Sequence, residues 1–141
     1  MSVRLGSSLS AIKKVYPPTK PWPSKREPNE GVDRIQLHLE DAKYFPVGVE
    51  QIIVDMRRGE VVKVKAVFDT DQTRKQPLSA LVKDLSQQYG EPRRIGMTYG
   101  WQDDQSLLKA YDAPVKKKDG SVSLRTAIEL SDLAAFRSEQ E

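Results

Sequence analysis

Two groups of aspartates have the spacing in this sequence that comes closest to catalytic chemistry. An apolar segment runs directly into Asp-x-Asp-x-Thr at residues 69–73, and a second acidic pair, Asp103-Asp104, follows another apolar stretch. An aspartate at the end of a buried strand can attack a phosphoryl group, a second can act as acid or base, and carboxylate oxygens hold Mg²⁺. The pattern raises the hypothesis of a Mg²⁺-dependent phosphotransferase that uses Asp69 and Asp71.

The Asp-x-Asp-x-Thr sequence resembles the nucleophile motif of the haloacid-dehalogenase phosphatases. That chemistry lies at the carboxyl ends of strands in a parallel, doubly wound sheet. Here hairpin-length connections flank the strand before Asp69, and only about 30 residues separate the two acidic pairs, which leaves no room for crossover helices. We therefore expect a solvent-exposed turn at residues 69–73, and the phosphotransferase remains a remote alternative.

Missing residue types exclude other chemistry. The chain has no cysteine, which excludes disulfides, thiol catalysis and cysteine-ligated metal centres. Its one histidine, His38, excludes sites with several histidine ligands. This side chain lies on the polar side of an expected strand, where no partner for general-base catalysis can be assigned. We predict that the protein is not an enzyme and has no catalytic residue, no metal site and no cofactor.

Positive charge is concentrated at the N-terminal end of the chain. The formal net charge is +3, and residues 1–30 hold six cations against two anions. Most other cations lie at expected turns and strand ends, as on an ordinary protein surface. Nucleic-acid-binding proteins instead collect cations on one face or along one helix. We therefore expect a protein partner and not a nucleic acid.

Length and hydrophobic content predict one domain. The 141 residues, of which 38% are hydrophobic, suffice for a single core within residues 1–141, with a flexible tail at 137–141. No apolar run approaches the roughly 20 residues of a membrane span. Residues 1–8 lack the apolar core of a secretory signal. We expect a cytoplasmic protein, or a protein of the periplasm or cell envelope if a leader has been removed.

A proline-rich strap occupies residues 17–31, where five prolines are interleaved with cations and Trp22. Such a segment is extended and polyproline-like, without internal hydrogen bonds. We expect Trp22 to bury the strap against a sheet. Two alternatives remain open: recognition of the PxxP sequence at 18–21 by another protein, and stacking of single-stranded nucleic acid on Trp22.

Periodicity predicts helices and strands in alternating groups. Apolar residues at helical spacing predict a short helix at 9–16 and a stronger one at 78–89, the latter bounded by Pro77 and Gly90. Alternation of apolar and polar residues predicts strands, and these lie at 34–40, 49–56, 60–68, 95–101, 105–111 and 122–130.

The expected architecture is an α+β fold in which helices pack on one face of an antiparallel sheet. Its order is helix, three strands, helix, three strands. Short connections favour antiparallel pairing, because parallel neighbours need crossovers of a dozen residues or more. Residues 9–12 read Leu-Ser-Ala-Ile and residues 78–81 read Leu-Ser-Ala-Leu. This similarity raises the hypothesis of a duplicated αβββ unit.

One expected strand has a large face and a nearly bare face. Along residues 95–101, large side chains alternate with glycine and threonine. Glycine inside a strand marks close backbone approach, so we expect the helix at 78–89 to pack on the bare face. The large face then needs another cover, either the strap or a second protein. The candidate interface residues are Trp22, Met97, Tyr99 and Trp101.

Residues 89–92 read Tyr-Gly-Glu-Pro and lie between the expected helix and a strand that ends in Trp101. This helix–Gly–x–Pro–strand–Trp pattern resembles small bacterial envelope domains of the outer-membrane-assembly lipoprotein and β-lactamase-inhibitor-like type. The resemblance implies a helix-plus-sheet module that binds proteins without catalysis, and it carries over no binding residue. We expect a non-enzymatic protein-binding or scaffold domain in a bacterial envelope assembly. The alternative is an inhibitor or immunity protein for a specific enzyme.

Overall fold

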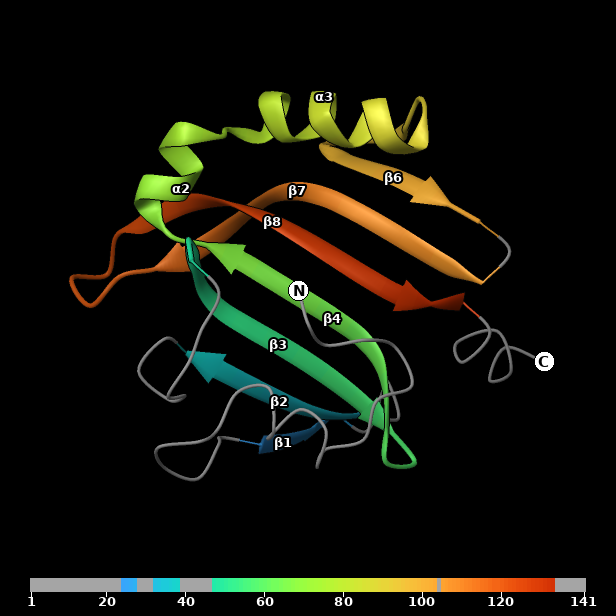
Figure 1. The fold of residues 1–141 in the computed structure, drawn as a ribbon. Helices are drawn as coiled ribbons and strands as arrows, with labels where there is room; N and C mark the ends of the chain where they lie inside the picture. Colours follow the sequence, from blue (N-terminus) through green and yellow to red (C-terminus); the bar gives the residue numbers. More distant parts are fainter. Residues whose placement is uncertain (1–23, 28–31, 39–46, 104, 134–141) are drawn as a thin grey trace.

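The computed structural model describes residues 24–27, 32–38, 47–103 and 105–133, and this part of the chain is mostly antiparallel sheet (Figure 1). Four strands precede two helices, and four strands follow them. The strands are β1 (Ser24–Glu27), β2 (Val32–His38), β3 (Val49–Arg57), β4 (Glu60–Phe68), β5 (Arg93–Ile95), β6 (Thr98–Gln102), β7 (Ser106–Lys116) and β8 (Val122–Asp132); the helices are α2 (Thr70–Lys75) and α3 (Leu78–Tyr89).

The eight strands of the described residues form one sheet with the order β1-β2-β3-β4-β8-β7-β6-β5. Every neighbouring pair is antiparallel, which confirms the expected α+β class with an antiparallel sheet. β4 and β8 pair at the centre, and a meander of hairpin-linked strands extends from each. Arg58 and Gly59 form the β3–β4 turn with φ of 53° and 79°. Positive φ at both central residues is what a type I′ hairpin turn requires.

The order of elements differs from the expected helix, three strands, helix, three strands. β1 and β5 add an edge strand to each group, and α2 precedes α3. The helix expected at 9–16 lies outside the described residues, as do the tail at 137–141 and most of the strap. Residues 24–27 of the strap form β1, which pairs with residues 32–35 of β2. This part of the strap is therefore a sheet strand and not a polyproline segment without hydrogen bonds.

α3 occupies the range that its apolar periodicity predicts. Pro77 precedes it with extended backbone angles, and Gly90 ends it with a φ of 89°. Positive φ after the last helical residue favours glycine. Figure 1 shows α3 above β6 and β7. Its buried Leu81 packs in one cluster with Trp101 and Ala110.

The single strand expected at 95–101 is wrong, because this segment is a hairpin. β5 ends at Ile95 and β6 begins at Thr98, with a two-residue turn between them. The first turn residue, Gly96, has a φ of 60°. Positive φ at this position alone defines a type II′ turn, which favours glycine there. Ile95 therefore pairs with Thr98 instead of sharing a face with Trp101.

The expected position of α3 on the bare face of β6 is also wrong. Leu81 clusters with Tyr99 and Trp101, which lie on the large face. Gly100 lies on the opposite face because side chains alternate along a strand. α3 thus supplies the cover that the sequence predicted would come from the strap or from a second protein.

One apolar face runs through both meanders. The cross-strand partners Val54, Val64, Leu130 and Leu108 follow one another across the sheet to Trp101. The β3 and β4 members of this row are fully buried. The larger part of the core therefore lies on the same side of the sheet as α3, and a second buried cluster, Val67, Ala113 and Ala127, lies on the opposite side. Among the described residues, no helix is both long enough and apolar enough to cross a membrane.

Candidate protein-binding site

Asp69 and Asp103, which belong to the two different acidic groups, lie at opposite ends of the sheet. Asp69 follows β4 and Asp103 follows β6. These two strands run in opposite directions, because β4, β8, β7 and β6 are successive antiparallel neighbours. The described residues, which do not include Asp104, contain no group of three acidic, histidine or cysteine residues that could hold a metal ion. The geometry therefore gives the phosphotransferase hypothesis no support.

Asp69 and Asp103 each accept hydrogen bonds from backbone N–H groups nearby. Asp69 Oδ1 accepts a hydrogen bond of 2.7 Å from the N–H three residues later, which makes it the N-cap of α2. The exposed turn expected here is therefore a short helix. Asp103 Oδ1 accepts from the N–H groups of Gln105 and Ser106, at 2.8 and 2.7 Å. These bonds hold the pKa of Asp103 below its ordinary value.

We expect Mg²⁺ to leave the melting temperature unchanged, because a ligand that binds only the native state must raise it. Asp71 is exposed, so Asp71→Asn should change stability by less than about 0.5 kcal/mol. Asp69→Asn should also cost little, since asparagine is an equally good N-cap. Thermal unfolding in millimolar Mg²⁺ and in chelator tests this. A rise of the melting temperature with Mg²⁺ that is lost when Asp69→Asn and Asp71→Asn are combined would restore the phosphotransferase hypothesis.

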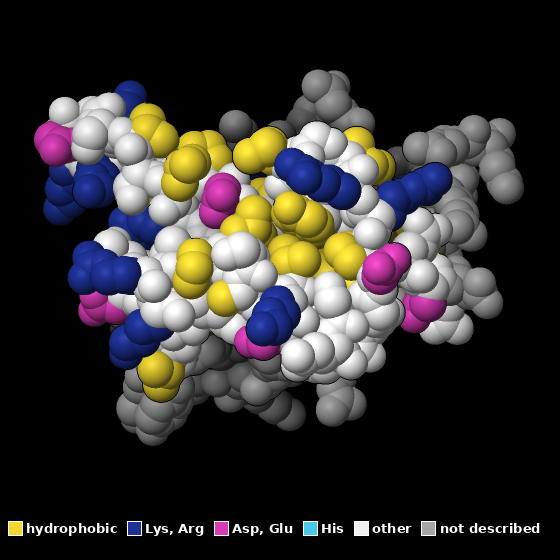
Figure 2. Space-filling model, turned by 90° about the horizontal axis from the view of Figure 1, so that it is seen from above, with side chains coloured by type: hydrophobic (Ala, Val, Ile, Leu, Met, Phe, Trp, Pro, Cys, Tyr) yellow, Lys and Arg dark blue, Asp and Glu magenta, His cyan; other side chains and the backbone are white. Residues whose placement is uncertain are grey.

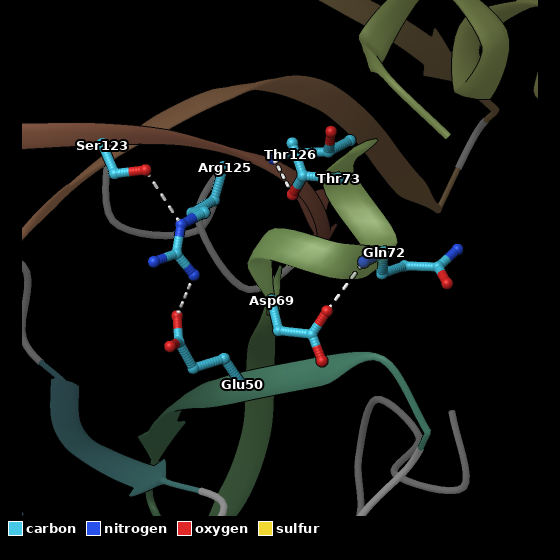
Figure 3. Close-up of polar contacts among 7 residues, drawn as sticks. All are labelled: Glu50, Asp69, Gln72, Thr73, Ser123, Arg125 and Thr126. Carbon is cyan, nitrogen blue, oxygen red and sulfur yellow. Dashed lines mark hydrogen bonds and ion pairs between the residues drawn. The ribbon is translucent and has the colours of Figure 1, made fainter. Parts of the chain in front are cut away.

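α2 closes the edge of β8 where β4 has ended (Figure 3). The Thr126 backbone N–H donates to Thr73 Oγ1 at 3.2 Å. Arg125 Nη1 donates to Glu50 Oε2 at 2.6 Å, and its Nε donates to Ser123 Oγ at 3.2 Å. These contacts join α2 and β3 to the base of the β7–β8 hairpin. These residues therefore hold α2, β3 and β8 together and have a structural role.

The candidate interface residues do not lie on one surface. Trp101 is buried, and its indole N–H donates to the backbone carbonyl after α3 at 2.8 Å. Tyr99 is half-buried, with the Arg94 guanidinium 5.5 Å from its ring centroid. Met97 is exposed at the β5–β6 turn. Trp22 lies outside the described residues. Trp101 is thus a core residue, and Met97 remains a candidate contact.

An open cavity of about 660 Å³ lies at the free edge of β6. β5 pairs only with residues 98–100 of β6, so no strand of the described part of the chain lies beside Trp101 and Gln102 on that side. The cavity takes its lining from both faces of the sheet, because Trp101 lies on the α3 face whereas Gly100 and Lys109 lie on the opposite face. Part of the lining is Tyr89, Arg93, Ile95, Gly100, Leu107 and Lys109.

Exposed hydrophobic side chains line this cavity. Tyr89 and Ile95 of the lining are 60% and 72% exposed, and Met97, in the turn after Ile95, is 71% exposed. Charged residues of the lining, among them Glu91, Arg93 and Lys109, lie beside these side chains. A group of exposed apolar side chains with a polar rim is typical of an interaction site.

A gap in the side chains, which we call the Gly100 notch, lies between two cations. Arg93 pairs with Gly100 across β5 and β6, and Gly100 pairs with Lys109 across β6 and β7. Strands lie about 4.8 Å apart, so the backbones of the two cations are roughly 10 Å apart. Leu107 borders the notch, with Cδ1 3.6 Å from where a Cβ on Gly100 would lie. The notch therefore combines positive charge with an apolar wall.

The charges of the cavity are segregated. The Arg93 side chain makes no hydrogen bond or ion pair within the described residues, and Lys109 Nζ lies 3.8 Å from Glu129 Oε2. Tyr111 Oη donates to the other Glu129 oxygen at 3.4 Å. Burial, together with the Glu129 carboxylate, raises the pKa of Tyr111. Arg93 and Lys109 thus border the notch, and the lining of the cavity also includes the anions Glu91 and Asp103.

Sequence reasoning missed the notch because it placed α3 on the bare face of β6. Gly100 was the available signal, since a glycine within a strand leaves a gap. Its neighbours Arg93 and Lys109 come from other strands, so only the register brings them together.

No protein-family model, no curated protein and no solved structure matches this chain.

Proposed function

We propose that this chain is a non-catalytic protein-binding domain that holds an extended segment of another protein along the free edge of β6. The observation that carries the proposal is the open cavity at an unpaired strand edge, bordered by exposed Tyr89 and Ile95. An extended segment can hydrogen-bond to such an edge through its backbone while pockets receive its side chains. A cavity of about 660 Å³ would also suit a small molecule, but only a polypeptide can use the free strand edge.

The Gly100 notch defines the chemistry of the bound segment. Arg93 and Lys109 flank the missing side chain, so a carboxylate fits between them. Leu107 and the exposed Ile95 provide apolar contacts beside it. The segment therefore carries an acidic residue next to a large apolar one. Anions at Glu91 and Asp103 disfavour further acidic residues there and so orient the segment.

The sequence resemblance to small bacterial envelope domains suggests the setting, a scaffold component of an envelope assembly. Two features support an origin by duplication of an αβββ unit. The meanders β2–β4 and β6–β8 extend from a central antiparallel pair, and residues 9–12 resemble residues 78–81. Trp22 stays a candidate contact in this proposal.

Peptide selection tests the proposed site directly. We expect a displayed library of random peptides, selected on the immobilised protein, to become enriched in an acidic residue beside a large apolar one. Gly100→Ala fills the notch. Its Cβ would meet only ordinary van der Waals contacts, the closest at 3.6 Å, so the variant should fold. We expect it and Arg93→Gln to weaken the selected peptides by about tenfold or more.

Lys83→Ala serves as the matched control, because this residue is exposed on α3 away from the cavity lining. It should leave peptide affinity unchanged. Selected peptides without an acidic preference, or equal binding to the wild type and both notch variants, would show that the edge of β6 is not the binding site.

A further inference from the structure

β7 and β8 extend past their outer neighbours as a two-stranded arm, residues 112–126. β6 pairs with β7 only at 107–110, and β4 pairs with β8 only at 127–131. β7 and β8 remain paired with each other as far as Lys116 and Val122. Figure 1 shows this hairpin projecting beyond α2 at the left of the molecule. The arm therefore presents a ribbon of its own beyond the body of the sheet.

The two faces of the arm differ in burial. On one face Ala113 is buried, and Val115 packs in the same hydrophobic cluster. On the opposite face Val122 and Leu124 are 64% and 62% exposed. Their cross-strand partners, a lysine and a proline, share that face and are also exposed. The apolar surface is thus confined to one face of an otherwise packed element.

The tip of the arm carries consecutive cations. Lys116, Lys117 and Lys118 are all exposed, and Figure 2 shows dark blue side chains gathered at this left end of the molecule. The one anion of the turn, Asp119, accepts hydrogen bonds from the Ser121 hydroxyl and N–H at 2.6 and 2.9 Å. These bonds hold its pKa below the ordinary value. The tip therefore keeps a net positive charge beside the exposed apolar face.

We propose that this arm binds the surface of an anionic membrane. Val122 and Leu124 enter the boundary between headgroups and acyl chains, and the lysines of the tip lie against the anionic headgroups. Apolar side chains rimmed by lysine are typical of elements that lie in the membrane interface. Binding uses the face of the arm and not its edge, because Pro114 in β7 has no N–H to offer an added strand.

A protein partner would need more surface than the arm offers. The exposed part of this face spans three residues on each strand, 114–116 and 122–124, which is roughly 10 Å by 10 Å at the usual rise and spacing. This is on the order of 100 Å², against about 800 Å² per partner in a stable interface. Binding to a bilayer requires no such minimum area, because single side chains partition into it. The observations therefore favour a lipid surface.

The arm is independent of the proposed protein-binding site. The Gly100 notch contacts β7 at Leu107 and Lys109, whereas the tip lies at the other end of β7, at Lys116. Gly100→Ala should therefore leave membrane binding unchanged, and variants of the tip should leave the selected peptides bound. Failure of one proposal does not affect the other.

Sedimentation with lipid vesicles tests the arm. We expect the full chain to bind vesicles of phosphatidylcholine and phosphatidylserine, to ignore phosphatidylcholine alone, and to dissociate as salt is raised. A lysine near an anionic surface contributes about fivefold in partitioning. The variant Lys116→Gln/Lys117→Gln/Lys118→Gln should therefore bind on the order of a hundredfold more weakly. The matched control Arg58→Gln/Lys83→Gln/Arg94→Gln, which removes the same charge from exposed sites away from the arm, should bind like the wild type.

Leu124→Trp reports whether the apolar face enters the bilayer. Its emission should shift to the blue with phosphatidylserine vesicles and remain unchanged with soluble phosphoserine, which separates a membrane from a free anion. Absence of wild-type binding to anionic vesicles, or equal weakening by the control triple variant, would overturn the proposal. Loss of an acidic protein partner in the tip variant, with vesicles ignored by the wild type, would overturn it in favour of protein docking.

Discussion

Asp55→Ala is expected to destabilise the protein by about 3–5 kcal/mol, because it removes the buried partner of an ion pair. Asp55 is only 1% exposed. Arg34 donates two hydrogen bonds to its carboxylate, from Nε to Oδ1 at 2.8 Å and from Nη2 to Oδ2 at 3.0 Å. The pair joins β2 to β3 in register. Urea unfolding followed by circular dichroism measures the loss.

Two further variants separate the ion pair from simple truncation. Asp71→Ala removes the same carboxylate from an exposed position and should cost less than about 0.5 kcal/mol. Arg34→Met combined with Asp55→Leu replaces both charges by apolar groups of similar size, and should recover most of the stability that Asp55→Ala loses. A cost of Asp55→Ala no larger than that of Asp71→Ala would contradict the role assigned to this pair.

Trp101→Ala is expected to cost about 3–5 kcal/mol, the range for truncating a buried aromatic side chain. Trp101 joins α3 to the sheet through Leu81 and Ala110, and its indole N–H donates to the Gly90 carbonyl at 2.8 Å. Trp101→Phe keeps most of the packing and loses this hydrogen bond, so about 0.5–1.5 kcal/mol of its cost comes from the lost bond. Met97→Ala, at an exposed position, is the matched control and should be nearly neutral. Equal costs at 97 and 101 would mean that α3 is not anchored through Trp101.

The Trp101→Phe variant also tests whether Trp22 of the proline-rich strap is buried. Trp22 is the only other tryptophan of the chain, so the remaining emission reports its surroundings. Blue-shifted emission that is shielded from acrylamide would bear out the prediction that Trp22 is buried. Red, freely quenched emission would instead favour the PxxP recognition hypothesis.

The elements that could be predicted from the sequence are those whose signals are local. The apolar spacing from Leu78 to Tyr89 predicts α3, because one helical face needs only residues close in the chain. Alternation along 49–56 and 60–68, with Arg58-Gly59 between them, predicts the β3–β4 hairpin. In these segments side-chain period and turn chemistry agree.

Two local predictions failed because a second local feature of the same segment decided its structure. At 69–73 the aspartates suggested an exposed turn, but Asp69 also satisfies an N–H of the first turn of α2. Along 95–101 the alternation continued through Gly96, and only its positive φ breaks the segment into a hairpin. In both segments one side chain or one backbone angle, which alternation of apolar residues does not detect, decided the structure.

Only the tertiary structure decides which distant segments meet. The pairing of β4 with β8 joins the two meanders into one sheet. No local sequence pattern in either strand predicts that they pair with each other. The notch exists because the register of three strands places Arg93, Gly100 and Lys109 in one row. A shift by one residue would turn every side chain of a strand to the other face. The sequence by itself therefore determined the longer elements of the described residues, such as α3 and the β3–β4 hairpin, and the antiparallel class. The choice of faces and neighbours, and with it the site, came from contacts between residues far apart in the chain.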